Sequence, residues 1–392
     1  MPPALIEEIK RVTRQFFDLP LGREIFLETS VPSNVEDNEK MDKLRRFVQA
    51  IPKVELHVHL EGALSANTLV ELARKHGISL PHDGAADRLF DFQELEDFFL
   101  VYELACQSMR DRSDFYRVTY ETLRRCAESN ARYVEFFFNP QTHLSFGVSY
   151  AEMLAGIVDA MTDVEAAYGL RSGVIPAYDR RLGPEPGAAF LDMVLGERPK
   201  EVIGIGIDYL EHPHNPAVFE AMYARARHAG LGVTAHVGFR GPAEHVWEAV
   251  DVLGCRRIDH GYHIVDDPAL MARCRDAQVG FTCCPTSALM ASVWRNPDAL
   301  DHPIRRMVES GLIVTVNTDD PGLFRTSLND EFMILARHMN VDCGMLGEIA
   351  LNGLRMSWLD SATRHAAIGE WTREINELLR TFDIGTPPIG MH

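Results

Sequence analysis

The sequence predicts an α/β protein built as a (β/α)8 TIM barrel. Eight short apolar runs rich in strand-forming residues alternate with longer segments of helical spacing. Such alternation is typical of parallel strands, and eight repeats predict a closed barrel. The expected strands are residues 54–60, 133–139, 173–178, 202–209, 232–237, 257–262, 279–285 and 313–319.

The segments between these strands complete the repeats. Several helices fit into the long gap between the first two strands, and about three more follow the eighth, within residues 325–382. An open doubly wound sheet is the alternative, but no Gly-rich phosphate fingerprint follows the first strand, which counts against a dinucleotide fold. The other expected helices are residues 115–129, 150–168, 216–229, 242–253, 267–277 and 303–310.

The chain divides into an N-terminal extension and one large domain. Residues 1–50 are expected to form a helical extension, with helical spacing in residues 4–17 and 41–50 and no candidate for chemistry. Residues 51–392 are expected to form one barrel domain, because no internal linker or repeat interrupts them.

The amino-acid composition and net charge indicate which kinds of molecule the protein binds. Hydrophobic residues make up 46% of the 392 residues, which is enough for a full core. The formal charge of −18 excludes nucleic acid and anionic membranes as expected partners, because no basic field is present to neutralise phosphates. We therefore expect a small-molecule substrate. The oligomeric state is left open.

Cysteine usage and the N-terminus predict a cytoplasmic protein. The seven cysteines contain no CxxC pair, so we expect reduced thiols. The first 17 residues carry five charged side chains and no unbroken apolar stretch, unlike a signal peptide. No run approaches the ~18 apolar residues that span a bilayer.

Unusual polar residues end four of the expected strands. His57 and His59 lie one residue apart in the first strand, so they face the same side. His236 ends the fifth strand, His260 the sixth, and Asp319 with Asp320 the eighth. A barrel brings its strand ends to one mouth. Three imidazoles and a carboxylate there suit one Zn2+ ion, which would lower the pKa of a bound water toward ~7.

The two remaining residues suit acid–base chemistry. His260 is placed to hold or deprotonate that water, and Asp320 to take a proton from it. A structural coincidence is the alternative, since a single histidine at a strand end is usually structural.

Residues 53–63, 234–238, 257–262, 284–287 and 316–321 resemble the adenosine deaminase family of the amidohydrolase superfamily. The resemblance implies hydrolysis of an amino group at an aromatic ring carbon, with release of ammonia. It implies that the metal ligands are His57, His59, His236 and Asp319, and that His260 and Asp320 orient and activate the attacking hydroxide. It also implies that Glu61 lies near the sugar of a nucleoside.

One position departs from the family's pattern at the centre of the chemistry. The family's fifth-strand motif His-Ala-Gly-Glu is here His-Val-Gly-Phe, ending at Phe239. The resemblance implies that this Glu protonates the ring nitrogen beside the reacting carbon. A phenyl ring offers only apolar or stacking contact, and losing such a donor costs roughly 10²–10⁴ in rate. Further departures are residues 208–214, Asp259 and Ala288.

The candidate metal ligands match the family's pattern, whereas residues expected near the substrate do not. Three hypotheses follow from this difference. The first is a zinc-dependent deaminase of an adenosine-like purine nucleoside or related aminated heterocycle, in which Glu211, Asp259 or a group on the substrate replaces the missing Glu. The second is a metal-dependent hydrolase with a different leaving group. The third is a catalytically impaired nucleoside-binding homologue. The expected substrate contacts are His59, Glu61, Glu211, Phe239 and Asp320.

An aromatic group lies between the first two strands. The family resemblance implies that this region caps the pocket as an apolar wall, and core packing is the alternative. The group consists of Phe90, Phe92, Phe98, Phe99 and Tyr102.

Overall fold

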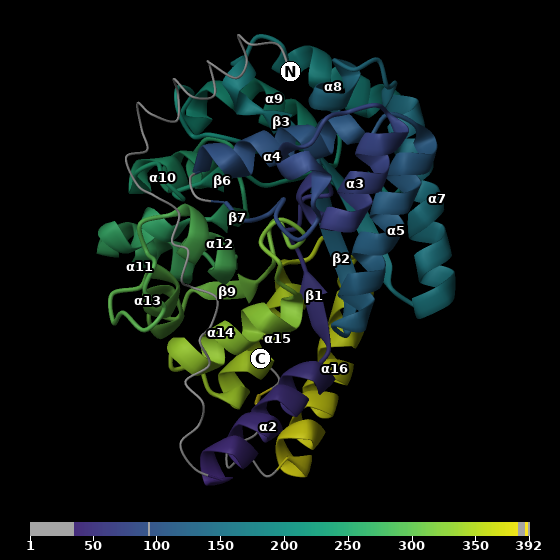
Figure 1. The fold of residues 1–392 in the computed structure, drawn as a ribbon. Coiled ribbons are helices and arrows are strands. Elements are labelled where there is room, and N and C mark those ends of the chain that lie inside the picture. The colour runs from purple at the N-terminus through teal and green to yellow at the C-terminus, as the bar shows by residue number, and fades with distance from the viewer. Residues whose placement is uncertain (1–34, 93–94, 383–388, 391–392) are drawn as a thin grey trace.

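A computed structural model describes residues 35–92, 95–382 and 389–390 of the chain (Figure 1). Its strands are all parallel and form two sheets. The first sheet runs β1 (Lys53–Glu55), β2 (Ala131–Phe138), β3 (Arg171–Asp179), β4 (Gly204–Asp208) and β5 (Gly232–Val233). The second runs β6 (His236–Val237), β7 (Arg257–His260), β8 (Gly280–Cys283) and β9 (Ile313–Val316).

One junction between the sheets lies within a single extended run. β5 and β6 are the two halves of the fifth predicted strand, separated by Thr234 and Ala235. The N–H of Thr234 still donates to the carbonyl of Ile205 on β4 (3.2 Å). The carbonyl of Ala235 accepts from the N–H of Asp259 on β7 (3.0 Å). The interruption is therefore local, and the sheet continues through it.

The other junction closes the barrel. Val58 pairs with Asp319 in a parallel bridge, and the N–H of Asp319 donates to the carbonyl of His57 (3.0 Å). These bonds join the segment after β1 to the segment after β9. The predicted (β/α)8 TIM barrel is thus confirmed, and the open sheet is not. The first strand is shorter than predicted, because beyond β1 only single bridges at Val58 and His59 continue it.

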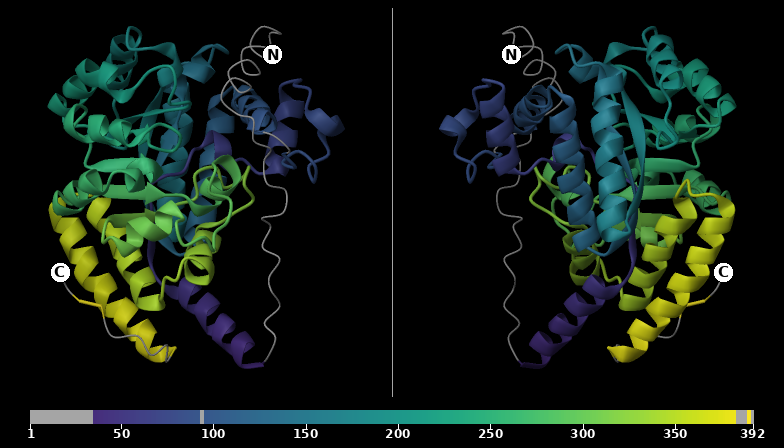
Figure 2. Two further views of the ribbon diagram at one scale, coloured as in Figure 1. Left: turned by 90° about the vertical axis from the view of Figure 1, so that its left-hand side faces the viewer. Right: turned by 90° about the vertical axis from the view of Figure 1, so that its right-hand side faces the viewer.

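Helices surround the strands (Figure 2). The gap between β1 and β2 holds α3 (Ala66–Lys75), α4 (Leu95–Ser108) and α5 (Arg112–Glu128). The later crossovers contain α6 (Pro140–Leu144), α7 (Tyr150–Tyr168), α8 (Gly187–Gly196), α9 (Glu220–His228), α10 (Ala243–Asp251), α11 (Pro268–Asp276), α12 (Pro285–Ala291) and α13 (Pro303–Glu309). After β9 come the three expected helices, α14 (Leu328–His338), α15 (Cys343–Met356) and α16 (Ser361–Thr381).

The ends of α7 are set by its capping residues and match the predicted ends. The hydroxyl of Ser149 accepts from the backbone N–H of Glu152 and begins α7 with a capping box. Gly169, at φ 68°, ends the same helix in the left-handed region that glycine adopts without strain. The helix expected at residues 150–168 is confirmed with the same bounds.

The N-terminal extension is described only in part. α2 (Val35–Ala50) contacts α14, α15 and α16 at the lower end of Figure 1. It includes the helix expected at residues 41–50, whereas that expected at 4–17 lies outside the described residues. The division at residue 50 stays a prediction.

Two further expectations concern the state of the cysteines and the presence of membrane-spanning helices. All seven cysteines are free and buried, as expected for reduced thiols. Among the described residues, no helix has the length and apolar character needed to cross a membrane.

Two glycines make room for an indole at one end of the barrel. A Cβ on Gly204 of β4 would lie 2.1 Å from the Trp358 ring, and one on Gly232 of β5 would lie 2.4 Å from it. The same indole ring also contacts Arg257, whose guanidinium carbon lies 4.0 Å from the ring centroid. Trp358 is therefore packed directly on the backbone of two neighbouring strands.

We expect Gly204→Ala to lower the free energy of unfolding by about 1–3 kcal/mol, because the added methyl group overlaps the indole. Urea unfolding measures this change. Gly196→Ala is the matched control, since a Cβ there has no atom within 4 Å. Equal stability of the two variants would contradict the packing described.

Candidate metal centre and active site

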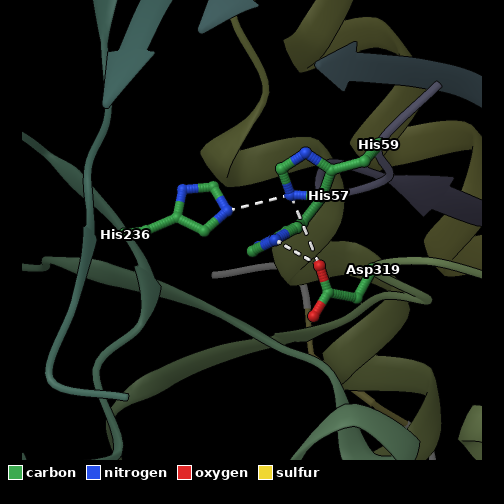
Figure 3. A group of neighbouring side chains, drawn as sticks. All are labelled: His57, His59, His236 and Asp319. Carbon is green, nitrogen blue, oxygen red and sulfur yellow. Dashed lines mark hydrogen bonds and ion pairs between the residues drawn. The ribbon is translucent and has the colours of Figure 1, made fainter. Parts of the chain in front are cut away.

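Four side chains predicted as metal ligands converge at the barrel mouth (Figure 3). Nε2 of His57 lies 3.2 Å from Oδ1 of Asp319, and Nε2 of His59 lies 3.4 Å from the same oxygen. Nε2 of His236 lies 3.0 Å from Nε2 of His59. All four residues are buried, although they come from segments on both sides of the barrel.

The donor set fits a metal ion. Nε2 of His57 is buried and makes no well-aligned hydrogen bond, although it lies 3.2 Å from Oδ1 of Asp319. Nε2 of His59 and Nε2 of His236 face each other at 3.0 Å. Burial, and then the charge of His236, lower the pKa of His59 well below its usual value, which favours the neutral ring that donates a lone pair. Three imidazoles with one carboxylate oxygen suit a borderline divalent cation.

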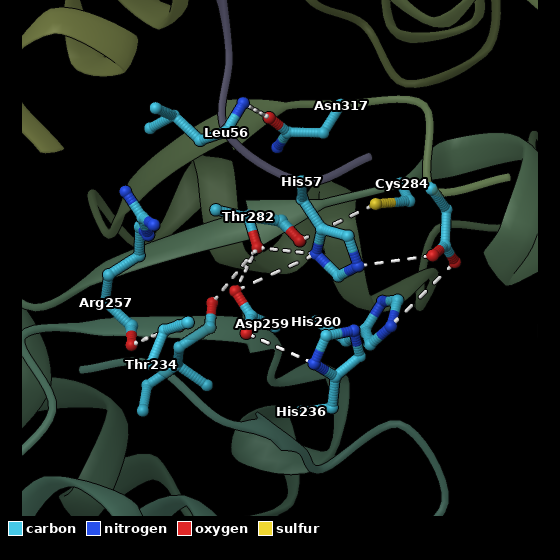
Figure 4. A network of polar contacts seen from close by, with 12 residues as sticks. Leu56, His57, Thr234, His236, Arg257, Asp259, His260, Thr282, Cys284 and Asn317 are labelled. Carbon is cyan, nitrogen blue, oxygen red and sulfur yellow. Dashed lines mark hydrogen bonds and ion pairs between the residues drawn. The ribbon is translucent and has the colours of Figure 1, made fainter. Parts of the chain in front are cut away.

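Two outer residues fix how these rings point (Figure 4). Nδ1 of His57 lies 2.9 Å from the hydroxyl of Thr282, which donates to Oδ1 of Asp259 (3.0 Å). The other oxygen of Asp259 lies 3.2 Å from Nδ1 of His236. Holding Nδ1 turns Nε2 of each ring toward the centre. Asp259 was expected near the substrate, but it stands behind the imidazoles, outside the cavity.

His260 and Asp320 stand beside this cluster. Nε2 of His260 lies 3.9 Å from Oδ2 of Asp319, and its ring centroid is 4.6 Å from that of His57. Burial, and then His57, lower the pKa of His260 to about 3, so the ring is neutral at neutral pH. Burial, and then Asp319, raise the pKa of Asp320 well above its usual value. Oδ1 of Asp320 has no hydrogen-bond partner.

A cavity of about 130 Å3 lies over the cluster and reaches His59, His236, His260, Asp319 and Asp320. The aromatic wall expected from the sequence is confirmed for Phe98, Phe99 and Tyr102, whereas Phe90 and Phe92 are buried in the core. The remaining lining residues are Asp208, Tyr209, Leu210, Glu211, Phe239, Arg240, Ser287, Ala291 and Phe324. Most of this wall is apolar or aromatic, which suits a flat ring.

Phe239 lies directly beside His260. The two ring centroids are 4.5 Å apart, and that of Tyr262 is 5.6 Å from Phe239. The backbone that carries Phe239 is held by Glu211, whose carboxylate accepts from the N–H groups of all four residues 238–241 at 2.7–2.9 Å. Phe239, which was predicted to contact the substrate, therefore lines the cavity from a loop whose backbone is held by hydrogen bonds.

Glu211 lines the cavity as well, but its carboxylate accepts hydrogen bonds from this loop. Nδ1 of His245 lies 3.1 Å from it in addition to the four backbone donors. Burial raises the pKa of Glu211, yet the hydrogen bond with His245, the charge of Arg180 and the backbone donors together lower it to about 2. An ionised carboxylate is a poor proton donor, so Glu211 does not supply the function of the missing Glu.

Glu61 lies behind the cavity wall. Its Oε1 accepts from the N–H of Asn139 (2.8 Å) and lies 3.0 Å from Nε2 of His143. The side chain is fully buried and is not among the lining residues. Its contact with a substrate stays a prediction.

Sequence analysis included Asp208 only within the altered segment 208–214 and gave it no role. This residue ends β4, lines the cavity, and lies 3.8 Å from Nδ1 of His59. Both of its oxygens accept from the side-chain amide of Asn139 (2.9 and 2.7 Å). An acidic residue ending a barrel strand was the available signal. Thr282, Tyr209 and Phe324 gave no comparable signal.

A family model described as "Adenosine deaminase" matches residues 52–372. The chain belongs to the adenosine deaminase family. The resemblance seen in the sequence is therefore confirmed, and the chain is a metal-dependent aminohydrolase acting on C–N bonds of cyclic amidines.

Relatives and solved structures agree with this assignment. An adenine deaminase of Hahella chejuensis is 34% identical over 320 residues, covering 81% of this chain and 95% of that protein. One of Bordetella avium is 37% identical over 313 residues, covering 79% and 98%. The crystal structure of an adenine deaminase from Arthrobacter aurescens is 33% identical, covers 84% and 100%, and has a TM-score of 0.78. An amidohydrolase from Burkholderia ambifaria with bound Zn is 34% identical, covers 91% and 97%, and has a TM-score of 0.83.

We expect Asp259→Asn to raise the dissociation constant for zinc by roughly 10–100-fold, because the ring of His236 loses its anionic partner. Competition with a chromophoric chelator measures this constant. Asp251→Asn is the control, because it removes a carboxylate paired with Arg273 on the surface. Equal zinc affinity of both variants would contradict the role given to Asp259.

We expect Glu211→Gln to lower the free energy of unfolding by about 3 kcal/mol at neutral pH. The folded-state pKa of Glu211 is about 2 against the ordinary 4.5. Its contribution is therefore complete above pH 4.5 and is lost as the pH falls toward 2. Urea unfolding of both proteins over this range tests the sign. A difference that grew on acidification would refute it.

Proposed function

We propose that this chain uses one zinc ion to hydrolyse the exocyclic amino group of an adenosine-like purine, as a base or nucleoside, or of a related aminated heterocycle, and releases ammonia. The observation that carries the proposal is the convergence of His57, His59, His236 and Asp319 beneath an aromatic-walled cavity that His260 and Asp320 also reach. The adenine deaminases among its relatives, and the zinc bound in the Burkholderia ambifaria structure, support it.

The proposed roles follow from where each side chain stands. Zinc, when bound, acts as a Lewis acid and lowers the pKa of water. His260, with a neutral ring, accepts a hydrogen bond from the attacking water and orients it. Asp320 takes a proton from that water and passes it to the leaving amine. His59 and Asp320 border the ring, which stacks against the aromatic wall.

The presence of Phe239 is the reason for two alternative functions. Because it replaces a ring-protonating Glu, the chain is alternatively a metal-dependent hydrolase with a different leaving group, or a catalytically impaired nucleoside-binding homologue. The free, buried cysteines support a cytoplasmic location for any of these functions.

The test is ammonia release by the zinc-loaded chain over a panel of 6-aminopurines, their nucleosides and other aminated heterocycles. We expect release from at least one compound, and a loss of roughly 10²–10⁴ in kcat with Asp320→Asn, because proton transfer is removed. Zinc content and melting temperature confirm that the variant is intact.

Other outcomes separate the alternatives. A product other than ammonia would favour a different leaving group. Tight binding without turnover in the zinc-loaded protein would favour the binding homologue. Either result overturns the deaminase proposal.

A further inference from the structure

The chemistry of the reaction sets a requirement on the ring. When water adds to a ring carbon that bears an amino group, an electron pair moves onto the neighbouring ring nitrogen. In a neutral ring this nitrogen must receive a proton or a strong hydrogen bond, and a positioned acid contributes roughly 10²–10⁴ in rate. A deaminase cavity therefore needs a donor at this nitrogen unless the ring already carries the charge.

The wall beside His260 offers no such donor. Phe239 presents a phenyl ring there, 4.5 Å from the imidazole. The loop's backbone is no substitute, because the N–H groups of residues 238–241 all donate to Glu211. Glu211 is in turn held ionised by His245, Arg180 and those backbone donors. Side chain and backbone are thus both unable to protonate a ring at this wall.

The other polar lining residues described have other partners or carry a weakly acidic hydroxyl. The Tyr102 hydroxyl donates to Oδ1 of Asn139 (3.4 Å), and the Tyr209 hydroxyl lies 3.5 Å from that of Thr142. Asp208 faces His59 and holds Asn139 with both oxygens, and Asp320 serves the attacking water. Asp259 lies behind the metal ligands. The exposed Arg240 donates to the carbonyl of Ala291 at the rim. Ser287 carries only a weakly acidic hydroxyl.

The same cavity suits a positive charge. Its wall carries six aromatic rings, and the faces of such rings attract cations. Besides the candidate metal ligand Asp319, three carboxylate residues line it, against the single guanidinium of Arg240 among the lining residues described. The aromatic rings belong to Phe98, Phe99, Tyr102, Tyr209, Phe239 and Phe324.

We propose that the substrate supplies its own activation: an aminated heterocycle with a positive charge on an alkylated ring nitrogen beside the reacting carbon, such as a 6-aminopurine alkylated at nitrogen 1. The alkyl group lies against Phe239, where a carboxylic acid would otherwise protonate the nitrogen. This inference rests on the proposed deaminase function and names its substrate class.

The step balances without a further reactant. The water oxygen forms a bond to the ring carbon, and the bond from that carbon to the amino nitrogen breaks. Both water protons join the amino group, which leaves as ammonium. The electron pair released into the ring neutralises the alkylated nitrogen, so a cation and water give a neutral oxo-heterocycle and ammonium.

The test compares kcat/KM of the zinc-loaded chain for 1-methyladenine and adenine, and for the corresponding nucleosides, at a pH where the methylated rings are cationic. We expect the methylated member of a pair to be favoured by about 100-fold or more. Phe239→Glu should lower that ratio by about 100-fold or more, because the carboxylic acid protonates the unmethylated ring and crowds the methyl group.

Phe239→Leu is the matched control, since it keeps an apolar contact and adds no acid. It should retain the preference for the methylated ring. Calorimetry gives a readout without turnover: 1-methylpurinium should bind the native chain more tightly than purine, neither of which has an amino group to lose. Should Phe239→Glu not fold, the native ratio and this binding pair decide.

The outcomes separate the two proposals. If unmethylated rings release ammonia as fast as methylated ones, the inference is overturned and the deaminase function stands. Ammonia from no compound, with zinc bound, overturns both. An unchanged ratio in a folded, zinc-containing Phe239→Glu protein would show that Phe239 does not set the substrate class.

Discussion

The hydrogen bond from the N–H of Asp319 to the carbonyl of His57 is the contact on which the rest of this structure depends. It closes the barrel, because it joins the segment after the first strand to the segment after the last. It also sets two side chains of the candidate metal centre next to each other, since the backbones of His57 and Asp319 share this hydrogen bond. Barrel closure and assembly of the candidate metal centre are therefore one event. A chain in which this seam did not form would lose both the β-barrel and the ligand geometry.

Around that seam, a second layer of polar residues gives the ligands their orientation. Asp259 and Thr282 hold two of the imidazoles from behind, and Asp208, which lines the cavity and binds Asn139, lies 3.8 Å from Nδ1 of the third. Each comes from a different strand or strand end, so the layer needs the whole barrel to exist. Aromatic and apolar side chains form much of the cavity lining, and an apolar surrounding strengthens the electrostatic interactions beside it.

Sequence reasoning found the barrel and the four side chains that converge at its mouth, because both have local signals in the sequence. Apolar runs alternate with helical segments, and histidine or aspartate stands at strand ends where such residues are unusual. It could not find Thr282 or Phe324, whose side chains resemble ordinary core or loop residues until tertiary packing turns them toward the site. It placed Glu211 at the cavity but missed its partners, because four backbone donors from one loop leave no trace in composition or spacing. The first strand was predicted too long for a similar reason, since the backbone beyond Glu55 makes only single bridges there.

The bond between Glu211 and its loop has a consequence for how this active site can change. The shape of residues 238–241 is specified by backbone groups and by a carboxylate that lies outside the loop, not by the side chain at position 239. The side chain at position 239 makes none of these hydrogen bonds, so we expect the main chain to keep its course when that side chain is replaced. The contacts that hold this loop are therefore separate from the side chain that faces the cavity, so a substitution at position 239 changes the cavity wall without removing these hydrogen bonds.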